Sequence, residues 1–216
     1  MHEERARVLQ AELDRFVDIV AFNANPSLDR TALIPDFAAG TLSRVPRILS
    51  LAGGKAFNVA RALRTLGVTS TVVAPLGGPM GDVVSQLARA EGLLCAWVAI
   101  AGATRTCLTI VDPATRRLTE IYEAGPELRA GEWEHIVADL LTTATRARLA
   151  VVCGSFLPGA PPHGLRDIVE RLTAAGVPVA IDTYGVQLTQ ALAARPTLVK
   201  INAHEAAPLV GREADE

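Results

Sequence analysis

The sequence is poor in several features that mark whole classes of protein. Its three cysteines, Cys95, Cys107 and Cys153, are widely separated and form no C-x-x-C pair. We interpret them as small buried residues of a reducing cytoplasm, with disulfide or zinc roles as remote alternatives. No apolar run approaches the roughly 18 residues of a membrane-spanning helix, and the acidic start is unlike a signal peptide. We therefore expect a cytoplasmic protein with no membrane partner.

The chain also lacks a basic segment and several common site motifs. Its formal net charge is -2 at pH 7, aromatic residues make up 4%, and the arginines stand singly or in pairs. Because the chain has neither a basic run nor an aromatic platform, we expect it not to bind nucleic acid. No G-x-G-x-x-G follows the first predicted strand, so a nicotinamide-dependent Rossmann enzyme is a remote alternative. The glycine-rich segment at 154–159 is neither a P-loop nor a G-x-S-x-G nucleophile turn.

What the sequence contains is an alternation of short apolar runs with segments of helical periodicity. Over 216 residues, half of them hydrophobic, this alternation predicts an α/β fold in which helices cover both faces of a mostly parallel sheet. The predicted strands are 16–22, 71–75, 149–153, 177–181 and 197–201. Two regions, 31–51 and 105–123, break the alternation and are interpreted as antiparallel hairpins. Residues 1–15 are predicted to form a charged helical extension of a domain that spans 16–216.

Three apolar stripes predict helices on the surface of this sheet. Each stripe repeats at the i, i+3, i+4 spacing of a helix face that packs on a core. The first is expected to stop at Gly67 and the third at Gly176. The stripes are Val59, Ala62, Leu63 and Leu66; Trp133, Ile136, Val137, Leu140 and Leu141; and Leu165, Ile168, Val169 and Leu172.

The start of the first helix has the composition of a ligand site. Gly53 and Gly54 precede Lys55 and Asn58. Two adjacent glycines let the backbone approach a bound group closely, and the first helical turn offers unpaired N–H groups to an anionic or oxygen-rich ligand. The segment therefore predicts a site for a polar ligand.

Six segments in a fixed order carry a resemblance to a known family. They are 25–29 (Asn-Pro-Ser-Leu-Asp), 51–67, 104–105 (Thr-Arg), 123–128 (Glu-Ala-Gly-Pro-Glu-Leu), 154–159 (Gly-Ser-Phe-Leu-Pro-Gly) and 200–205 (Lys-Ile-Asn-Ala-His-Glu). Together they resemble the ribokinase-like (PfkB) carbohydrate kinases, in the branch of the 1-phosphofructokinases and tagatose-6-phosphate kinases. The resemblance covers nearly the whole chain. It implies a ribokinase-like three-layer sandwich with a small β lid, whose strands would lie within 31–52 and 104–123.

The resemblance implies a sugar-phosphate site. Asp29 would accept hydrogen bonds from sugar hydroxyls, although an Asx turn or helix cap is the alternative for such a residue. Arg105 would hold the phosphate of the substrate, because a guanidinium pairs bidentately with phosphate oxygens. For Lys55, a solvated lysine at the helix start is an equal alternative. The other implied substrate contacts are Gly53, Gly54, Asn58 and Ser155.

Some positions depart from the family pattern or concern a second subunit. Ala56 stands where the family usually has a third glycine, and Phe57 replaces a small aliphatic residue. We expect these two changes to reshape the substrate pocket. The lid is implied to pair with a second copy, giving a homodimer. Arg44 would then reach the partner's site, or else be a solvated arginine of an edge strand.

A nucleotide element is implied near residue 200. Asn202 and Glu205 match the N-x-x-E element that organises magnesium beside the phosphates of ATP, and Lys200 would neutralise the nucleotide. Magnesium keeps several waters and is often held indirectly by carboxylates, so both residues are predicted to act on it indirectly. A helix cap at Asn202 with a solvated Glu205 is the alternative. Asp182, after another strand, has either a polar-site or a capping role, and His204 is not expected to be a ligand.

The function implied by the resemblance is ATP-dependent phosphorylation of a sugar phosphate, with ATP and magnesium as cofactors. Candidate substrates are fructose 1-phosphate, fructose 6-phosphate and tagatose 6-phosphate. The family's Gly-Ala-Gly-Asp motif, which supplies the catalytic base, is expected beyond Glu216, so no catalytic residue is assigned. The alternative is a non-catalytic sugar-phosphate-binding protein or a truncated, inactive fragment.

Overall fold

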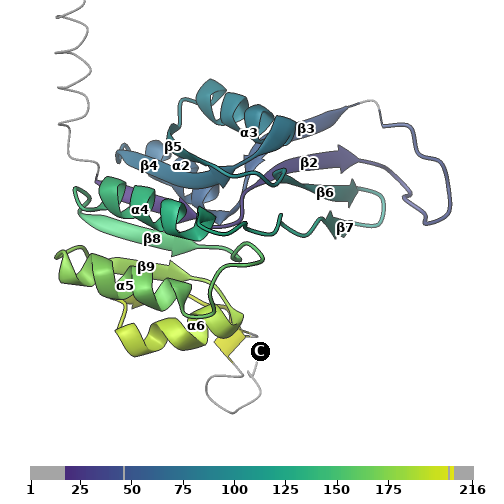
Figure 1. Cartoon of the computed structure of the whole chain (residues 1–216). Coiled ribbons are helices and arrows are strands. Elements are labelled where there is room, and N and C mark those ends of the chain that lie inside the picture. The colour runs from purple at the N-terminus through teal and green to yellow at the C-terminus, as the bar shows by residue number, and fades with distance from the viewer. Residues whose placement is uncertain (1–17, 46, 204, 207–216) are drawn as a thin grey trace, which may run out of the picture.

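The computed structural model describes residues 18–45, 47–203, 205 and 206, and its larger sheet has six strands (Figure 1). Their order is β10-β9-β8-β1-β4-β5, and every pairing is parallel. The strands are β1 (Ile19–Asn23), β4 (Ser70–Leu76), β5 (Leu94–Ala99), β8 (Leu149–Cys153), β9 (Val179–Asp182) and β10 (Leu198–Val199). The predicted α/β fold is confirmed. The predicted extension at 1–15 lies outside the described residues.

Two groups of helices cover the two faces of this sheet. Val20 and Phe22 of β1 belong to one buried cluster and Ala21 to the other, because successive side chains of a strand point to opposite faces. The first cluster packs against α4 (Glu132–Ala144), α5 (Gly164–Ala174) and α6 (Gly185–Ala191), the second against α2 (Lys55–Thr65) and α3 (Gly78–Ala90). A 3-10 turn, η1 (Leu192–Ala194), follows α6.

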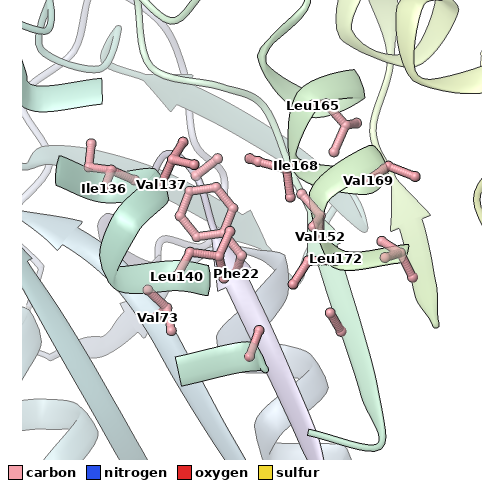
Figure 2. Packing of buried hydrophobic residues seen from close by; sticks show 14 of the residues in the cluster. Phe22, Val73, Ile136, Val137, Leu140, Val152, Leu165, Ile168, Val169 and Leu172 are labelled. Atoms are coloured by element: carbon pink, nitrogen blue, oxygen red, sulfur yellow. The ribbon is translucent and has the colours of Figure 1, made fainter. Parts of the chain in front are cut away.

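The first cluster confirms two of the predicted helix stripes. Ile136 and Leu140 of α4 and Leu165 and Leu172 of α5 are at most 1% exposed, and they belong to the same buried cluster as Phe22 (Figure 2). The predicted stop of α5 also holds. Gly176 has φ +79°, and the next backbone N–H donates to the Leu172 carbonyl at 2.9 Å, which is the Schellman pattern that ends many helices.

The predicted buried face of α2 is wrong except at Val59, which is partly buried against the second cluster. The helix buries Ala56, Phe57 and Ala60, whereas Ala62 is exposed and Leu66 is 75% exposed. The Phe57 ring packs against Trp97 of β5, with ring centroids 6.2 Å apart. The small residues at 56 and 60 bring the helix close to the sheet, so the leucine stripe chosen from the sequence is turned away from it.

A second, four-stranded sheet projects from the body (Figure 1). We call it the lid sheet, and its order is β3-β2-β6-β7. Two antiparallel hairpins, β2/β3 and β6/β7, are joined by a parallel pairing of β2 with β6. The strands are β2 (Ser27–Leu33), β3 (Ile48–Gly53), β6 (Arg105–Asp112) and β7 (Arg117–Tyr122). Strand β2 begins four residues before the predicted first excursion and therefore includes Asp29.

Besides the turn η1, three elements in or beside the larger sheet were not predicted. They are α3, β5 and α6. Helix α3 begins at Gly78-Pro79, a position where proline is tolerated because the first helical N–H groups have no intrahelical partner. No helix in the part of the chain that the structure describes is long and apolar enough to cross a membrane.

Candidate functional site

The predicted site residues gather at the carboxyl edge of the larger sheet and at the base of the lid sheet. Strand register places Asn23, Cys153 and Asp182 side by side at the ends of β1, β8 and β9. Gly53 and Gly54 join the lid strand β3 to helix α2 beside this edge. Ligands of open α/β sheets bind outside the carboxyl ends of the strands, so this edge is the candidate functional site.

The two glycines make room for side chains of the protein itself. A Cβ on Gly53 would lie 2.1 Å from Asp29 Oδ1, and a Cβ on Gly54 would lie 2.4 Å from Asn23 Nδ2. The Asn23 amide donates to the Gly53 carbonyl at 3.0 Å, and Gly54 has φ +113°, a conformation that L side chains rarely adopt. The glycines therefore let Asn23 and Asp29 lie directly against the turn.

Asp29 lies within strand β2 and is half-buried. Its Oδ1 accepts a hydrogen bond from Ser27 Oγ at 2.6 Å. The alternative of an Asx turn or helix cap is therefore wrong for Asp29. Register pairs Ser27 with Arg105 and Asp29 with Cys107, and paired residues of neighbouring strands share a face. Asp29 and Arg105 thus lie on the same face of the lid sheet.

Arg105 and Ser155 come together through a residue to which the sequence assigned no role. Arg105 Nη2 donates to the backbone carbonyl of Asn25 at 3.1 Å, and Nη1 donates to the Glu123 carbonyl at 3.2 Å. The Asn25 amide in turn donates to Ser155 Oγ at 3.2 Å. Asn25 is 6% exposed and Asn23 is 1% exposed. The sequence analysis missed both residues; the signal that could have found them is the pair of asparagines at the end of the first apolar run.

The Lys55 side chain extends across the sheet edge and forms an ion pair, so it is not simply a solvated lysine at the helix start. Its Nζ lies 2.6 Å from Asp182 Oδ1, and Lys200 Nζ lies 3.1 Å from Asp182 Oδ2. Partial burial acts to lower the pKa of Lys55, but the hydrogen bond and charge of Asp182, with a smaller contribution from Glu205, outweigh it and raise that pKa. Asp182 is therefore a polar-site residue that links the glycine turn to the segment at 200–205.

The cysteines play no ionic part in this site. Burial, followed by the nearby charge of Asp182, raises the pKa of the Cys153 thiol to about 12, and burial likewise raises the pKa of Cys95 to about 12. Both groups therefore stay protonated near neutral pH, and a thiol is a poor nucleophile and metal ligand. Cys107 and Cys153 are buried, as expected, whereas Cys95 is only partly buried.

Asn202 and Glu205 bond to each other. The Asn202 backbone N–H donates to Glu205 Oε2 at 2.9 Å, and the Glu205 N–H donates to Asn202 Oδ1 at 2.8 Å. This reciprocal pair is the capping-box pattern, so the cap alternative describes the geometry. Glu205 Oε1 takes no part in it. Among the described residues, no group of three or more His, Cys, Asp or Glu side chains could hold a metal ion.

Four other positions named in the sequence analysis do not join the cluster. Asn58 is exposed, and its Oδ1 accepts a hydrogen bond from Arg61 at 2.9 Å. Phe57 is fully buried against Trp97, so its ring belongs to the core between α2 and the larger sheet. Ala56 is also fully buried in α2. Arg44 is exposed in the connection between β2 and β3, and His204 lies outside the described residues.

Known proteins place this architecture in one family. The profile described as pfkB family carbohydrate kinase matches residues 22–216. The 1-phosphofructokinase of Rhodobacter capsulatus is 31% identical over 195 residues, which is 90% of this chain and 62% of that protein. The tagatose-6-phosphate kinase of Staphylococcus epidermidis is 30% identical over 194 residues, with coverages of 89% and 62%.

A solved structure agrees with these sequence relatives. Phosphofructokinase-2 from Escherichia coli, crystallised in complex with fructose-6-phosphate, has a TM-score of 0.86 and 28% identity. The match covers 93% of this chain and 66% of that one. The chain spans 62% of the length of both sequence relatives. It belongs to the pfkB family of carbohydrate kinases.

Proposed function

We propose that this chain forms the sugar-phosphate-binding part of an ATP-dependent sugar-phosphate kinase. The observation that carries the proposal is the placement of Arg105 and Asp29 on one face of the lid sheet, with Ser155 tied to Arg105 through Asn25. A guanidinium and a hydroxyl suit a phosphate group, and a carboxylate suits sugar hydroxyls. The site thus offers hydrogen-bond donors for the phosphate and a hydrogen-bond acceptor for the sugar hydroxyls.

The relatives narrow the class of substrate. One is named 1-phosphofructokinase and another tagatose-6-phosphate kinase. The third, a phosphofructokinase-2, was crystallised with fructose-6-phosphate. All three names refer to a phosphorylated ketohexose. We therefore propose fructose 1-phosphate, fructose 6-phosphate or tagatose 6-phosphate as the substrate, with phosphoryl transfer to a free hydroxyl of the sugar.

ATP and magnesium are the proposed cosubstrate and metal. Glu205 Oε1, which takes no part in the cap, fits a site that meets magnesium through its waters, because among the described residues no group of three or more His, Cys, Asp or Glu side chains converges to bind the ion directly. Lys200 is proposed to neutralise charge on the nucleotide. When bound, Mg·ATP supplies the γ-phosphoryl group. In this scheme Lys55 and Lys200, both paired with Asp182, provide positive charge beside the transferred group. The base is proposed to be the aspartate of a Gly-Ala-Gly-Asp motif that this sequence does not contain.

Arg105→Ala tests the phosphate-binding role. We expect the variant to lose about 100-fold in affinity for fructose 6-phosphate and little for fructose, since a charged hydrogen-bonded contact contributes about 1.5–3 kcal/mol. Isothermal titration calorimetry with both sugars measures this. Equal losses for fructose 6-phosphate and fructose would exclude the phosphate clamp. The matched control is Arg166→Ala, which removes an exposed arginine paired with Glu170 on α5.

Turnover separates the kinase from its non-catalytic alternative. We expect this chain alone to bind a sugar phosphate but to show no ATP-dependent phosphorylation, because no described residue is assigned the base role. Addition of the missing motif, in a longer chain, is expected to restore transfer. ATP-dependent turnover by residues 1–216 alone would contradict this division.

We further propose that the lid pairs with a second copy of the chain. Strand register places four exposed side chains, Leu33, Leu49, Leu118 and Tyr122, on one face of the lid sheet, and Asp29 lies on that same face. Exposed apolar patches of this kind mark interaction surfaces. A second lid packed on this face would cover the apolar side chains and close over Asp29.

Two substitutions in the same strand test this pairing. Leu118 lies on the Asp29 face and is 65% exposed, whereas Ile121 lies on the opposite face and is 55% exposed. Leu118→Lys is expected to give monomers because it places a charge in the apolar interface, and Ile121→Lys is expected to leave the dimer intact. Sedimentation velocity measures the outcome. A wild-type monomer, or equal effects of both changes, would contradict the lid dimer.

A further inference from the structure

Asn25 occupies the point where three connections of the chain meet. It lies between β1 and β2, and its side chain contacts residues of the β7–α4 and β8–α5 connections. A Cβ on Gly125, in the first of these, would lie 2.4 Å from Asn25 Oδ1. The glycine at 125 therefore allows this connection to pass directly over the Asn25 amide.

The contacts of Asn25 join two residues that are far apart in the sequence. Its backbone carbonyl accepts from Arg105 Nη2 at 3.1 Å, and its side-chain amide donates to Ser155 Oγ at 3.2 Å. One residue that is 94% buried thus fixes both the Arg105 guanidinium from the lid sheet and the Ser155 hydroxyl from the β8–α5 connection. Its burial restricts the geometry of both partners.

The same cluster contains unpaired polar atoms. Within the part of the chain that the structure describes, Asn25 Oδ1 and Arg105 Nε are buried side-chain atoms with no hydrogen-bond partner. An unpaired buried donor or acceptor is unfavourable, and most such groups in native proteins find partners. The cluster leaves one acceptor and one donor unused by the chain, which is the arrangement expected of a site completed by a polar ligand.

We infer that Asn25 is a positioning residue that makes Arg105 and Ser155 act as one phosphate-binding unit. The inference rests on the proposed function, since it names the residue that organises the same site. The Asn25 amide directs the lone pair of Ser155 Oγ toward itself, which leaves the Ser155 hydroxyl proton free to point at an anion. The Asn25 carbonyl holds one edge of the Arg105 guanidinium, so the outer N–H groups face the same anion.

A double-mutant cycle tests the coupling. The variants are Asn25→Ala, Ser155→Ala and the double substitution, and the readout is the dissociation constant for fructose 6-phosphate and for fructose. We expect each single change to weaken binding of fructose 6-phosphate about tenfold and to leave fructose binding unchanged. The double variant should lose no more than either single variant, because both changes disable the same unit. If the loss of affinity in the double variant equals the product of the two single losses, the positioning role is wrong. Equal losses of affinity for fructose 6-phosphate and fructose would also overturn it.

A matched control separates positioning from folding. Gln187 of α6 is also a buried amide with two backbone hydrogen bonds, to Leu165 N and the Pro161 carbonyl. Gln187→Ala should lower the melting temperature without changing the preference for the phosphorylated sugar. Should Asn25→Ala fail to fold, the nearly isosteric Asn25→Asp replaces it. It lets Ser155 donate its proton to the new carboxylate, and it is expected to abolish the preference. Retention of the wild-type preference in Asn25→Asp would overturn the inference.

The design distinguishes failure of this inference from failure of the proposed function. If the wild-type chain does not prefer fructose 6-phosphate to fructose, both are wrong. If the wild-type chain has this preference and Arg105→Ala removes it, while Asn25→Ala retains it, then the phosphate site is correct and only the role of Asn25 is wrong.

Discussion

The two halves of the candidate site are built differently. At the proposed sugar end, Asn23 and Asn25 are 1% and 6% exposed, and their partners come from segments distant in the sequence. At the proposed nucleotide end, the Lys200 side chain is 66% exposed, and the side chains of Asn202 and Glu205 each accept a hydrogen bond from the other's backbone N–H. The strand that leads to them, β10, has two residues and lies at the edge of the sheet.

This difference shows what each half requires in order to form. Buried polar side chains with long-range partners are fixed by the whole fold, so their geometry is as stable as the core. A local capping pair at a sheet edge is fixed only by its own short segment. Changes at the sugar end should therefore affect global stability, whereas changes at the nucleotide end should not.

Gly54→Ala should have the largest effect. The added Cβ meets the Asn23 amide at 2.4 Å, and φ +113° is unfavourable for alanine. We expect a loss of about 3–5 kcal/mol in the free energy of unfolding, from backbone strain and from the clash together. Chemical denaturation measures it.

Gly67→Ala is the control for strain alone. Gly67 has φ +74° and would place its Cβ in open space, so the expected loss is about 1–2 kcal/mol. If Gly54→Ala and Gly67→Ala lowered the free energy of unfolding equally, the packing of Asn23 against the glycine turn would contribute nothing to stability.

Glu91→Gln, which alters the ion pair between α2 and the end of α3, should have an intermediate effect. Arg61 donates to both carboxylate oxygens of Glu91, at 2.6 and 2.8 Å, and to the Ala52 carbonyl of β3 at 2.8 Å. We expect a loss of about 1–2 kcal/mol at pH 7. The exposed i,i+4 pair of Arg166 and Glu170 provides the control, because Glu170→Gln should cost less than about 0.5 kcal/mol.

The pH dependence of the same variant checks its cause. The hydrogen bond from Arg61 lowers the pKa of Glu91 below its ordinary value of 4.5, despite partial burial. The folded state therefore binds this proton less readily than the unfolded state, and the stabilisation is complete above pH 4.5 and is lost as the pH falls through the lowered pKa. The difference in unfolding free energy between wild type and Glu91→Gln should shrink over that range. A difference that is constant with pH would exclude the ion pair.

The sequence predicted the sheet better than the details of the site. The run at 149–153 coincides with β8, and the α4 and α5 stripes are buried as expected, because β-branched runs and helical periodicity reflect local burial. The α2 stripe was wrong. Two apolar faces compete on that helix, and small residues at 56 and 60, which permit close approach to the sheet, carry less hydrophobic weight than the leucines at 63 and 66.

The functions of the glycines and of Asn25 could not be read from the chain. Gly53 and Gly54 were correctly placed before a helix, but the side chains that lie over them come from positions 29 and 23. Asn25 meets Arg105 and Ser155 across separations of 80 and 130 residues. Such contacts depend on how β2 pairs with β6 and how β1 pairs with β8, and a single sequence contains no signal for that register.

The smallest effect is expected from Asn202→Ala, and Asn23→Ala is its counterpart at the sugar end. Both remove an asparagine side chain that makes a hydrogen bond with the backbone, at 2.8 Å for Asn202 and 3.0 Å for Asn23. Asn23→Ala leaves the buried Gly53 carbonyl without this donor and should cost about 1–3 kcal/mol. Asn202→Ala frays an exposed segment and should change the free energy of global unfolding by less than about 0.5 kcal/mol. Denaturation that reports equal losses would mean that the nucleotide end unfolds together with the core, and the proposed division of the site would then be incorrect.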